Sequence, residues 1–420
     1  MTHRSNIYII GFVSVPFMGA YLLSELFRNI NSTIGPVLQQ EFALDAATLG
    51  LMTSLFLFAV AGSQIFTGIL LDRLGARRTV AMLLIIAAIG AMLFAAGNFT
   101  TLLVGRLLIG IGMSGCWTAA FKVNADWWPK DRLALANGAI IGLAGLGSLA
   151  ATLPTRLLLD IMPWNDLFVW LAALTVGMAV ILFTLVPENR EKTNTASADR
   201  FNLLTELQGF GLIMKNPVII AFAPVSIIRQ GAWLSYQGLW TGIWLRDVTG
   251  LAPTPVATSL LFLAICIVIG NLCLGLVADI LIRLRVSLFR SMFLACCLYI
   301  LAQILIIFLP ASATTGLWML FGFFLAGPIF AYALISQAVP ATHSGRAVSL
   351  LNLFATLAGF LMQYGIGAVV NQWVAIDGIY PAAAHITALV AVICVQLAAL
   401  VWWLLRRGPL NQAVRDMGSA

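Results

Sequence analysis

Apolar residues form long runs along the chain, and short segments between the runs hold most of the charged side chains. The run from Ala81 to Ala96 carries no charge, and many runs reach the roughly 20 residues that a helix needs to cross a hydrocarbon core of about 30 Å. A window of about 19 residues detects such segments. It places spans near residues 7–32, 46–71, 77–97, 101–125, 134–157, 165–187, 216–243, 254–281, 287–309, 315–339, 347–371 and 382–405. The pattern predicts an all-α polytopic membrane protein with 12 transmembrane helices.

The spans fall into two groups of six, separated by the longest polar stretch of the chain. Gly68-Ile-Leu-Leu-Asp72, after the second span, recurs about half a chain later as Gly275-Leu-Val-Ala-Asp279, after the eighth. This repetition indicates duplication and predicts two pseudo-symmetric six-helix bundles, with a ligand site between them and a rocking motion of one half against the other. The expected boundaries are an N-terminal bundle over residues 1–187, a cytoplasmic linker over 188–215 and a C-terminal bundle over 216–420.

Composition agrees with a membrane location. The chain is 61% hydrophobic and 9% charged, whereas soluble domains carry about 25% charged residues. The net charge of +7 follows from Lys and Arg gathered in loops on one side, which the positive-inside rule assigns to the cytoplasm, so it does not indicate a nucleic-acid partner. We therefore expect a multi-pass protein of the cell inner membrane with both termini in the cytoplasm. The six Cys lack metal-type spacing and are expected to be packing residues.

Two motifs resemble signatures of the major facilitator superfamily. Gly68-Ile-Leu-Leu-Asp72-Arg73-Leu-Gly75-Ala-Arg77-Arg78 is similar to the family's loop between spans two and three, and Gly105-Arg106-Leu-Leu-Ile-Gly110-Ile-Gly112 to its glycine-rich fourth span. The resemblance implies a secondary transporter that works by alternating access. It also implies a gate at the loop. The gate and signature residues are Gly68, Asp72, Arg73, Gly75, Arg77 and Arg106, with Asp279 in the second half.

The Gly-Pro pair found in the fifth span of many drug-proton antiporters of this family is missing from Gly142-Leu-Ala-Gly-Leu-Gly-Ser148. Arg28-Asn29 in the first span and Arg229-Gln-Gly in the seventh resemble instead the paired arginines of the organophosphate and organic-anion branches. The resemblance thus favours an anionic cargo over a drug.

Few charges lie inside the predicted spans, and a charge in hydrocarbon is a functional hypothesis by default. Most of these few are basic, and they fall on spans that line the central cavity in the family. Since Arg binds carboxylate or phosphate with a planar fork, the substrate is expected to be a small organic acid or organophosphate. The predicted substrate-binding residues are Arg28, Arg229, Lys122, a stripe of Trp233, Tyr236 and Gln237 in span seven, and Tyr332. Two of the basic residues have a structural alternative. Arg106 would organise its neighbouring spans, and Lys122 would extend to the water at the membrane interface.

Glu25 lies three residues before Arg28, which places both on one helical face. It is the predicted proton carrier: an anionic substrate that takes over Arg28 would leave the carboxyl desolvated and ready to bind a proton. A permanent structural ion pair is the alternative.

Other classes of protein fit the sequence less well. The three His are dispersed, and the chain has neither a Gly-x-Ser-x-Gly elbow nor a phosphate-binding loop, so neither an enzyme nor an ATP-driven pump is expected. We expect no cofactor and no metal, with protons, a small anion and the lipid bilayer as partners, and the resemblance makes a monomer the expected state. Within carriers, the alternative is a proton-driven exporter of drugs or siderophore-like compounds that uses Glu25 as its titrating group.

Overall fold

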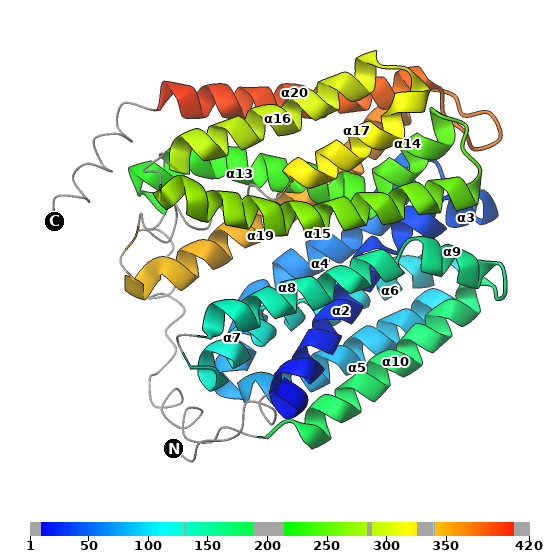
Figure 1. The fold of residues 1–420 in the computed structure, drawn as a ribbon. Coiled ribbons are helices and arrows are strands. Elements are labelled where there is room, and N and C mark those ends of the chain that lie inside the picture. The colour runs from blue at the N-terminus through cyan, green and yellow to red at the C-terminus, as the bar shows by residue number, and fades with distance from the viewer. Residues whose placement is uncertain are drawn as a thin grey trace. The chain divides into compact units, whose positions relative to one another are not determined.

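A computed structural model describes residues 10–129, 132–187, 214–283, 288–325, 339 and 341–406. Within these residues the chain is helical, and its β-type pairing is an isolated bridge between Ile376 and Ile379 (Figure 1). The expected all-α membrane fold is confirmed. Eleven helices among the described residues are long and apolar enough to cross a membrane, and a shorter apolar helix, Ser312–Phe324, lies where the tenth span is expected.

The chain divides into two compact units. The first unit holds residues 1–44 and 51–200, and the second holds Asp45–Gly50 and residues 201–420. The helices of the first unit are η1 (Ile10–Ser14), α2 (Val15–Asn29), α3 (Asn31–Glu41), most of α4 (Ala46–Arg73), α5 (Gly75–Ala95), α6 (Phe99–Met113), α7 (Cys116–Trp127), α8 (Leu133–Ala150), α9 (Leu153–Leu159) and α10 (Trp164–Leu185).

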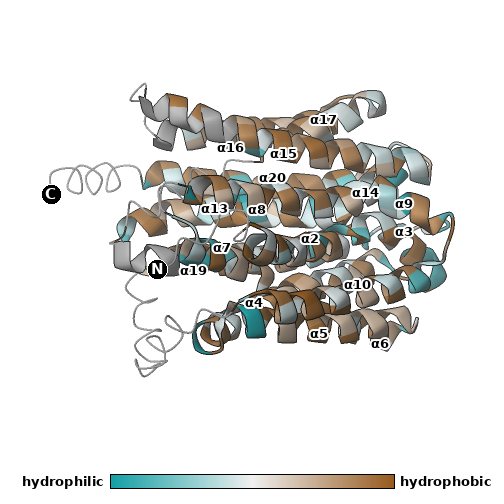
Figure 2. Ribbon diagram, turned by 60° about the horizontal axis from the view of Figure 1, so that its bottom comes forward, coloured by the Kyte–Doolittle hydropathy of each residue, from teal (hydrophilic) through white to brown (hydrophobic). Residues whose placement is uncertain are grey.

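Among the described residues, the second unit begins with the first turn of α4 and continues after the segment predicted as the linker. Most of that linker segment lies outside the described residues. Its further helices are α13 (Pro217–Ser235), η2 (Tyr236–Trp240), α14 (Thr241–Asp247), α15 (Pro253–Arg283), α16 (Leu288–Phe308), α17 (Ala311–Phe324), α19 (Ala341–Val370) and α20 (Ala382–Leu405). Brown apolar residues run along nearly all of these helices, as lipid-facing and core-facing surfaces both require (Figure 2).

The helical path differs from the predicted spans near the N-terminus. The first span is expected to end near residue 32, but α2 ends at Asn29 and α3 continues to Glu41 after a break of one residue. Hydropathy misses this extension because α3 carries Asn31, Ser32, Gln39 and Gln40 among its apolar residues.

The glycine-rich α6 packs very closely on α5. A Cβ atom added at Gly112 would lie 2.5 Å from the Cβ of Ala87 and 2.5 Å from the carbonyl oxygen of Leu83. Farther along the same face, Gly105 and Gly90 approach each other in the same way. Small residues at such crossings let helix backbones come together in a membrane, where packing replaces the hydrophobic effect as the driving force.

We expect Gly112→Ala to lower the stability of the protein by about 1–3 kcal/mol, because the added methyl group would overlap backbone atoms of α5. Thermal unfolding of the detergent-purified protein measures the change. Gly142→Ala is the matched control, since a Cβ atom there would meet nothing within 4 Å. Equal melting temperatures for the two variants would contradict the packing assigned to α6.

Candidate functional site

An ion pair on α2 forms the centre of the candidate site in the first unit. Arg28 donates from Nη2 to Oε2 of Glu25, and the side chains are 19% and 9% exposed, respectively. The three-residue spacing therefore brings the two groups together, as the sequence predicts. Both charges lie within a helix that is long and apolar enough to cross the membrane, where an unpaired charge is costly.

Polar groups from α8 and α2 brace this pair. Ser148 donates from Oγ to Oε2 of Glu25 at 3.1 Å. The same hydroxyl accepts a hydrogen bond from Nδ2 of Asn29 at 2.9 Å, and Asn29 also donates to the carbonyl oxygen of Glu25 at 2.8 Å. Gly147 allows the approach, because a Cβ atom there would lie 2.1 Å from the carbonyl oxygen of Leu22. We call Glu25, Arg28, Asn29 and Ser148 the α2–α8 cluster.

Arg106 is fully buried and ties α6 to the junction between α2 and α3. Its guanidinium donates to the carbonyl oxygen of Phe27 at 3.1 Å and to the side chain of Asn31. The Cζ atom lies 4.8 Å from the ring centroid of Phe94 and 5.9 Å from that of Phe168. These contacts fit the structural alternative for this residue, in which it organises the neighbouring spans.

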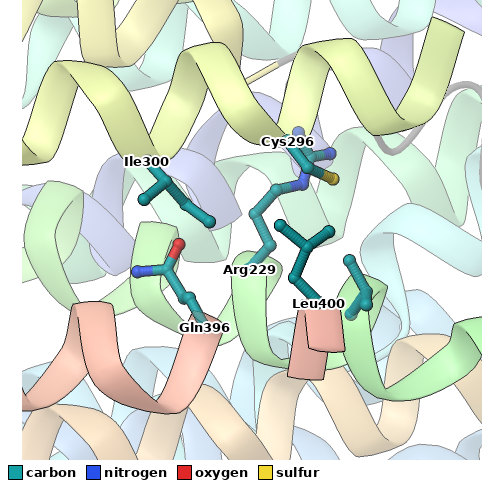
Figure 3. A pocket seen from close by; sticks show the side chains of 6 residues that line it. Arg229, Cys296, Ile300, Gln396 and Leu400 are labelled. Carbon is teal, nitrogen blue, oxygen red and sulfur yellow. The ribbon is translucent and has the colours of Figure 1, made fainter. Parts of the chain in front are cut away.

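Arg229 is buried among helices of its own unit. Its side chain is 3% exposed and faces α16, α17 and α20 of its own unit. It donates to the carbonyl oxygen of Phe324 at 3.4 Å, and its Cζ atom lies 5.6 Å from the ring centroid of Tyr299. The side chain also lines a small cavity together with Val225, Cys296, Ile300, Gln396 and Leu400 (Figure 3).

The stripe predicted in span seven is buried in the second unit. Tyr236 packs on Trp318 and Phe321, at ring-centroid distances of 5.2 and 6.1 Å. Among the described residues, its hydroxyl and the Oε1 atom of Gln237 have no hydrogen-bond partner, and both lie in the π-helical turn η2. Trp233 is half-buried on α13, the helix that precedes η2. Tyr332, another predicted site residue, lies outside the described residues.

An ion pair joins the last turn of α4 to α7, between residues far apart in the sequence. Lys122, predicted as a substrate-binding residue, pairs with Asp72 and also donates from Nζ to the carbonyl oxygen of Leu71 at 3.1 Å. Asp72 is well exposed. Lys122 thus joins α7 to the end of α4 and does not lie with the α2–α8 cluster.

The remaining signature residues support the turn after α4. Gly75 has a φ of +80°, a conformation that glycine adopts without strain. Arg77 donates to the carbonyl oxygen of Val186 at 3.0 Å and lies 5.1 Å from the ring centroid of Phe183. Gly68 and Arg73 lie in the last turns of α4. Asp279 lies in α15, and its side chain is outside the described part of the chain.

A polar network in the second unit was not predicted from the sequence. Asp247 accepts hydrogen bonds at Oδ1 from Nε of Arg246, at 2.5 Å, and at Oδ2 from the backbone N–H of Tyr380, at 3.2 Å. Nε2 of His385 also lies 2.9 Å from Oδ2, and both of these side chains are buried. A signal existed, since Asp247 follows the predicted span 216–243 by four residues and His385 lies in the first turn of the predicted span 382–405.

The hydroxyl of Tyr380 extends this network to the beginning of α4. It accepts a hydrogen bond from the backbone N–H of Ala46 at 2.9 Å and donates to Oδ1 of Asn371 at 3.1 Å. Burial works against the charge of Asp45, but hydrogen bonds from Thr48 and Asn371 hold its pKa below the ordinary value. These bonds fix Asp45–Gly50 within the second unit.

Known proteins resemble this chain over much of its length. A probable sulfoacetate transporter of Cupriavidus necator is 25% identical over 46% of this chain and 43% of its own length. The hexuronate transporter of Bacillus subtilis is 25% identical over 84% of this chain and 86% of its own length. Multidrug resistance protein MdtL of Escherichia coli is 30% identical over 46% of this chain and 49% of its own length. The chain thus spans less than half of two of these relatives and most of the third.

The fold is shared with solved transporter structures. The crystal structure of a bacterial homologue of the human lysosomal transporter Spinster superposes with a TM-score of 0.78, at 17% identity, and covers 98% of this chain and 99% of that chain. The family model of the Major Facilitator Superfamily matches residues 17–362. With the signature motifs and the helical fold, these matches show that the chain belongs to the Major Facilitator Superfamily of membrane transporters.

Proposed function

We propose that this transporter moves a small organic anion, an organic acid or an organophosphate, across the inner membrane by alternating access, and that it couples this movement to protons. The observation that carries the proposal is the ion pair of Glu25 and Arg28 on α2. In this account Arg28 binds the anionic group of the substrate and Glu25 carries the proton.

The chemistry of the pair supports an exchange of partners. Arg28 is more exposed than Glu25, so an incoming carboxylate or phosphate meets the guanidinium first. A substrate anion that takes both parallel N–H groups of Arg28 displaces the carboxylate of Glu25. Without its cation, that carboxylate is left in a poorly hydrated position, which favours the protonated form. Ser148 can hydrogen-bond either form, because a hydroxyl both donates and accepts.

The relatives lend support of a different kind. Two of them are named as transporters of organic anions, a hexuronate and sulfoacetate, and the hexuronate transporter matches over most of its length. The rival function is a proton-driven exporter of drugs or siderophore-like compounds, which the partial similarity to MdtL favours. The charge of the cargo separates the two proposals.

We expect organic acids to raise the melting temperature of the purified protein, while neutral and cationic drugs leave it unchanged, because a ligand stabilises the state that it binds. Arg28→Gln should weaken the effect at least tenfold, since a hydrogen bond between charged groups contributes about 1.5–3 kcal/mol. Arg156→Gln is the matched control, an arginine of the same unit whose partner is Asp160. Stabilisation by cationic drugs, or an unchanged response in Arg28→Gln, would overturn the anion proposal.

The exchange of partners also predicts a pH dependence. If one proton is taken up with each anion, the apparent affinity should rise as the pH falls, by up to tenfold per pH unit. Glu25→Gln removes the titrating group, so its affinity should not change with pH. Calorimetric titration with the best organic acid at several pH values measures the slope. A slope that persists in Glu25→Gln would assign the proton to another group.

We propose that the end of α4 and the turn after it, with the Asp72–Lys122 pair that joins α4 to α7, belong to a gate and not to the binding site. Asp72→Asn should then slow transport at least tenfold and leave the affinity for the substrate within about threefold of that of the unmodified protein. The reason is that loss of the ion pair affects the conformational step and not substrate binding. Uptake into proteoliposomes and thermal-shift titration measure the two quantities. A large loss of affinity with unchanged maximal uptake would place Asp72 and Lys122 in the substrate site instead.

A further inference from the structure

The first turn of α4 is bound in the second unit, while the rest of this helix belongs to the first. The backbone N–H of Ala46, which has no partner within its own helix, donates to the hydroxyl of Tyr380 at 2.9 Å. That hydroxyl donates to Oδ1 of Asn371 at 3.1 Å, and Nδ2 of Asn371 donates to Oδ2 of Asp45 at 3.3 Å. We call Asp45, Ala46, Asn371 and Tyr380 the clasp.

The backbones of α4 and α19 approach each other closely beside the clasp. A Cβ atom added at Gly367 would lie 2.4 Å from the carbonyl oxygen of Ala46, and one added at Gly50 would lie 2.9 Å from the carbonyl oxygen of Gln363. The indole of Trp240 donates to the same carbonyl oxygen of Gln363 at 2.9 Å. Glycine on both helices therefore permits a close crossing, and the hydrogen bonds of the clasp hold the helices together at it.

Tyr380 is held in place by other parts of the second unit and not by α4. Asp247, at the end of α14, accepts the backbone N–H of Tyr380 at 3.2 Å and pairs with His385 of α20. Arg246 donates from Nη2 to the carbonyl oxygen of Gly378 at 3.1 Å, so α14 binds the loop between α19 and α20 at two points. The hydroxyl of Tyr380 would therefore stay in position if the first turn of α4 moved away.

The two ends of α4 are bound to different units. In its last turn, Asp72 pairs with Lys122 of α7, which belongs to the first unit. Between the ends lie 28 residues of uninterrupted helix without proline, a length of about 42 Å at 1.5 Å per residue. A continuous helix cannot follow both units when one moves against the other, so the bonds at one end must break. The clasp consists mainly of hydrogen bonds between neutral groups, which contribute less than bonds between charged groups.

We propose that Tyr380 is a positioning residue for the conformational step of transport: its hydroxyl holds the first turn of α4 in the second unit, and the clasp opens in each transport cycle. The loops that meet here follow the first, seventh and eleventh predicted spans, so they lie on the side of the membrane opposite the N-terminus. The clasp keeps the protein closed on that side. This inference rests on the proposed alternating access, but not on the nature of the cargo.

The first test needs no cargo. Leu49 lies in the first turn of α4 and is fully buried, so a membrane-impermeant maleimide should react with the Leu49→Cys protein only when the clasp opens. Tyr380→Phe removes the hydroxyl and keeps the ring, and it should speed this reaction about tenfold, because two hydrogen bonds are lost. Tyr364→Phe is the matched control, since Tyr364 is 40% exposed and lies outside the clasp. Proteins without Leu49→Cys give the background from the six native cysteines.

The second test distinguishes a clasp that opens from a merely structural contact. The side chains of Asp45 and Asn371 are in hydrogen-bond contact, so Asp45→Cys and Asn371→Cys together should form a disulfide on oxidation. In proteoliposomes, oxidation should lower the uptake of an organic acid at least tenfold, and reduction should restore it. Each single variant is the control and should not respond to oxidation. A contact that stays closed throughout the cycle would leave uptake through the cross-linked protein unchanged.

Asn371→Ala keeps the labelling test decisive if Tyr380→Phe fails to fold, because it removes the acceptor of the Tyr380 hydroxyl at an exposed position. It should also speed the labelling of Leu49→Cys. If the unmodified protein moves no organic acid, the proposed cargo is wrong and the labelling still decides the role of the clasp. Labelling as slow in Tyr380→Phe and Asn371→Ala as in the control, or undiminished uptake through the cross-linked protein, would overturn the proposal.

Discussion

Hydrocarbon offers no hydrogen bonds, and this constraint governs both the helices and the few charges within them. Every backbone polar group in a span must be satisfied inside the protein, which explains why the described residues form helices almost throughout. The same constraint makes every intramembrane charge costly unless neighbouring groups compensate it. The arginines within the spans therefore mark the places where polar side chains and carbonyl groups lie inside an otherwise apolar fold.

Three arginines are compensated in three different ways. Arg28 has a carboxylate partner, Glu25, and a network that extends to α8. Arg106 depends on a carbonyl, an amide side chain and two rings, which join α6 to the helices around it. Arg229 has one long hydrogen bond and a cavity. An exchangeable partner suits transport, and fixed neutral partners suit a structural role.

Local sequence patterns predicted the fold well. The length and apolar character of the spans follow from bilayer thickness, and the helices appear close to the predicted positions. The pairing of Glu25 with Arg28 was equally predictable, because a spacing of three residues places two side chains on one helical face. The extension of α3 to Glu41 was missed, since polar residues in a buried helix lower the hydropathy without breaking the helix.

Contacts between distant segments were not predictable from these patterns. Helical periodicity shows that Arg229 and Tyr236 share a face, but it does not show that this face meets α16 and α17. The partner of Lys122 lies in another helix, and so does the Ser148 that braces Glu25. Both pairs depend on how helices pack, which small residues such as Gly147 permit at particular crossings.

The central claim is that an organic anion and a proton move together through the Glu25–Arg28 pair. Proteoliposomes that contain the protein and an internal pH-sensitive dye test it most directly, with a hexuronate, a neutral sugar and a cationic drug added outside in turn. The account predicts that the hexuronate alone acidifies the interior, and that Glu25→Gln abolishes this acidification. Proton movement driven by the cationic drug, with none driven by the organic anion, would contradict the account and favour the exporter.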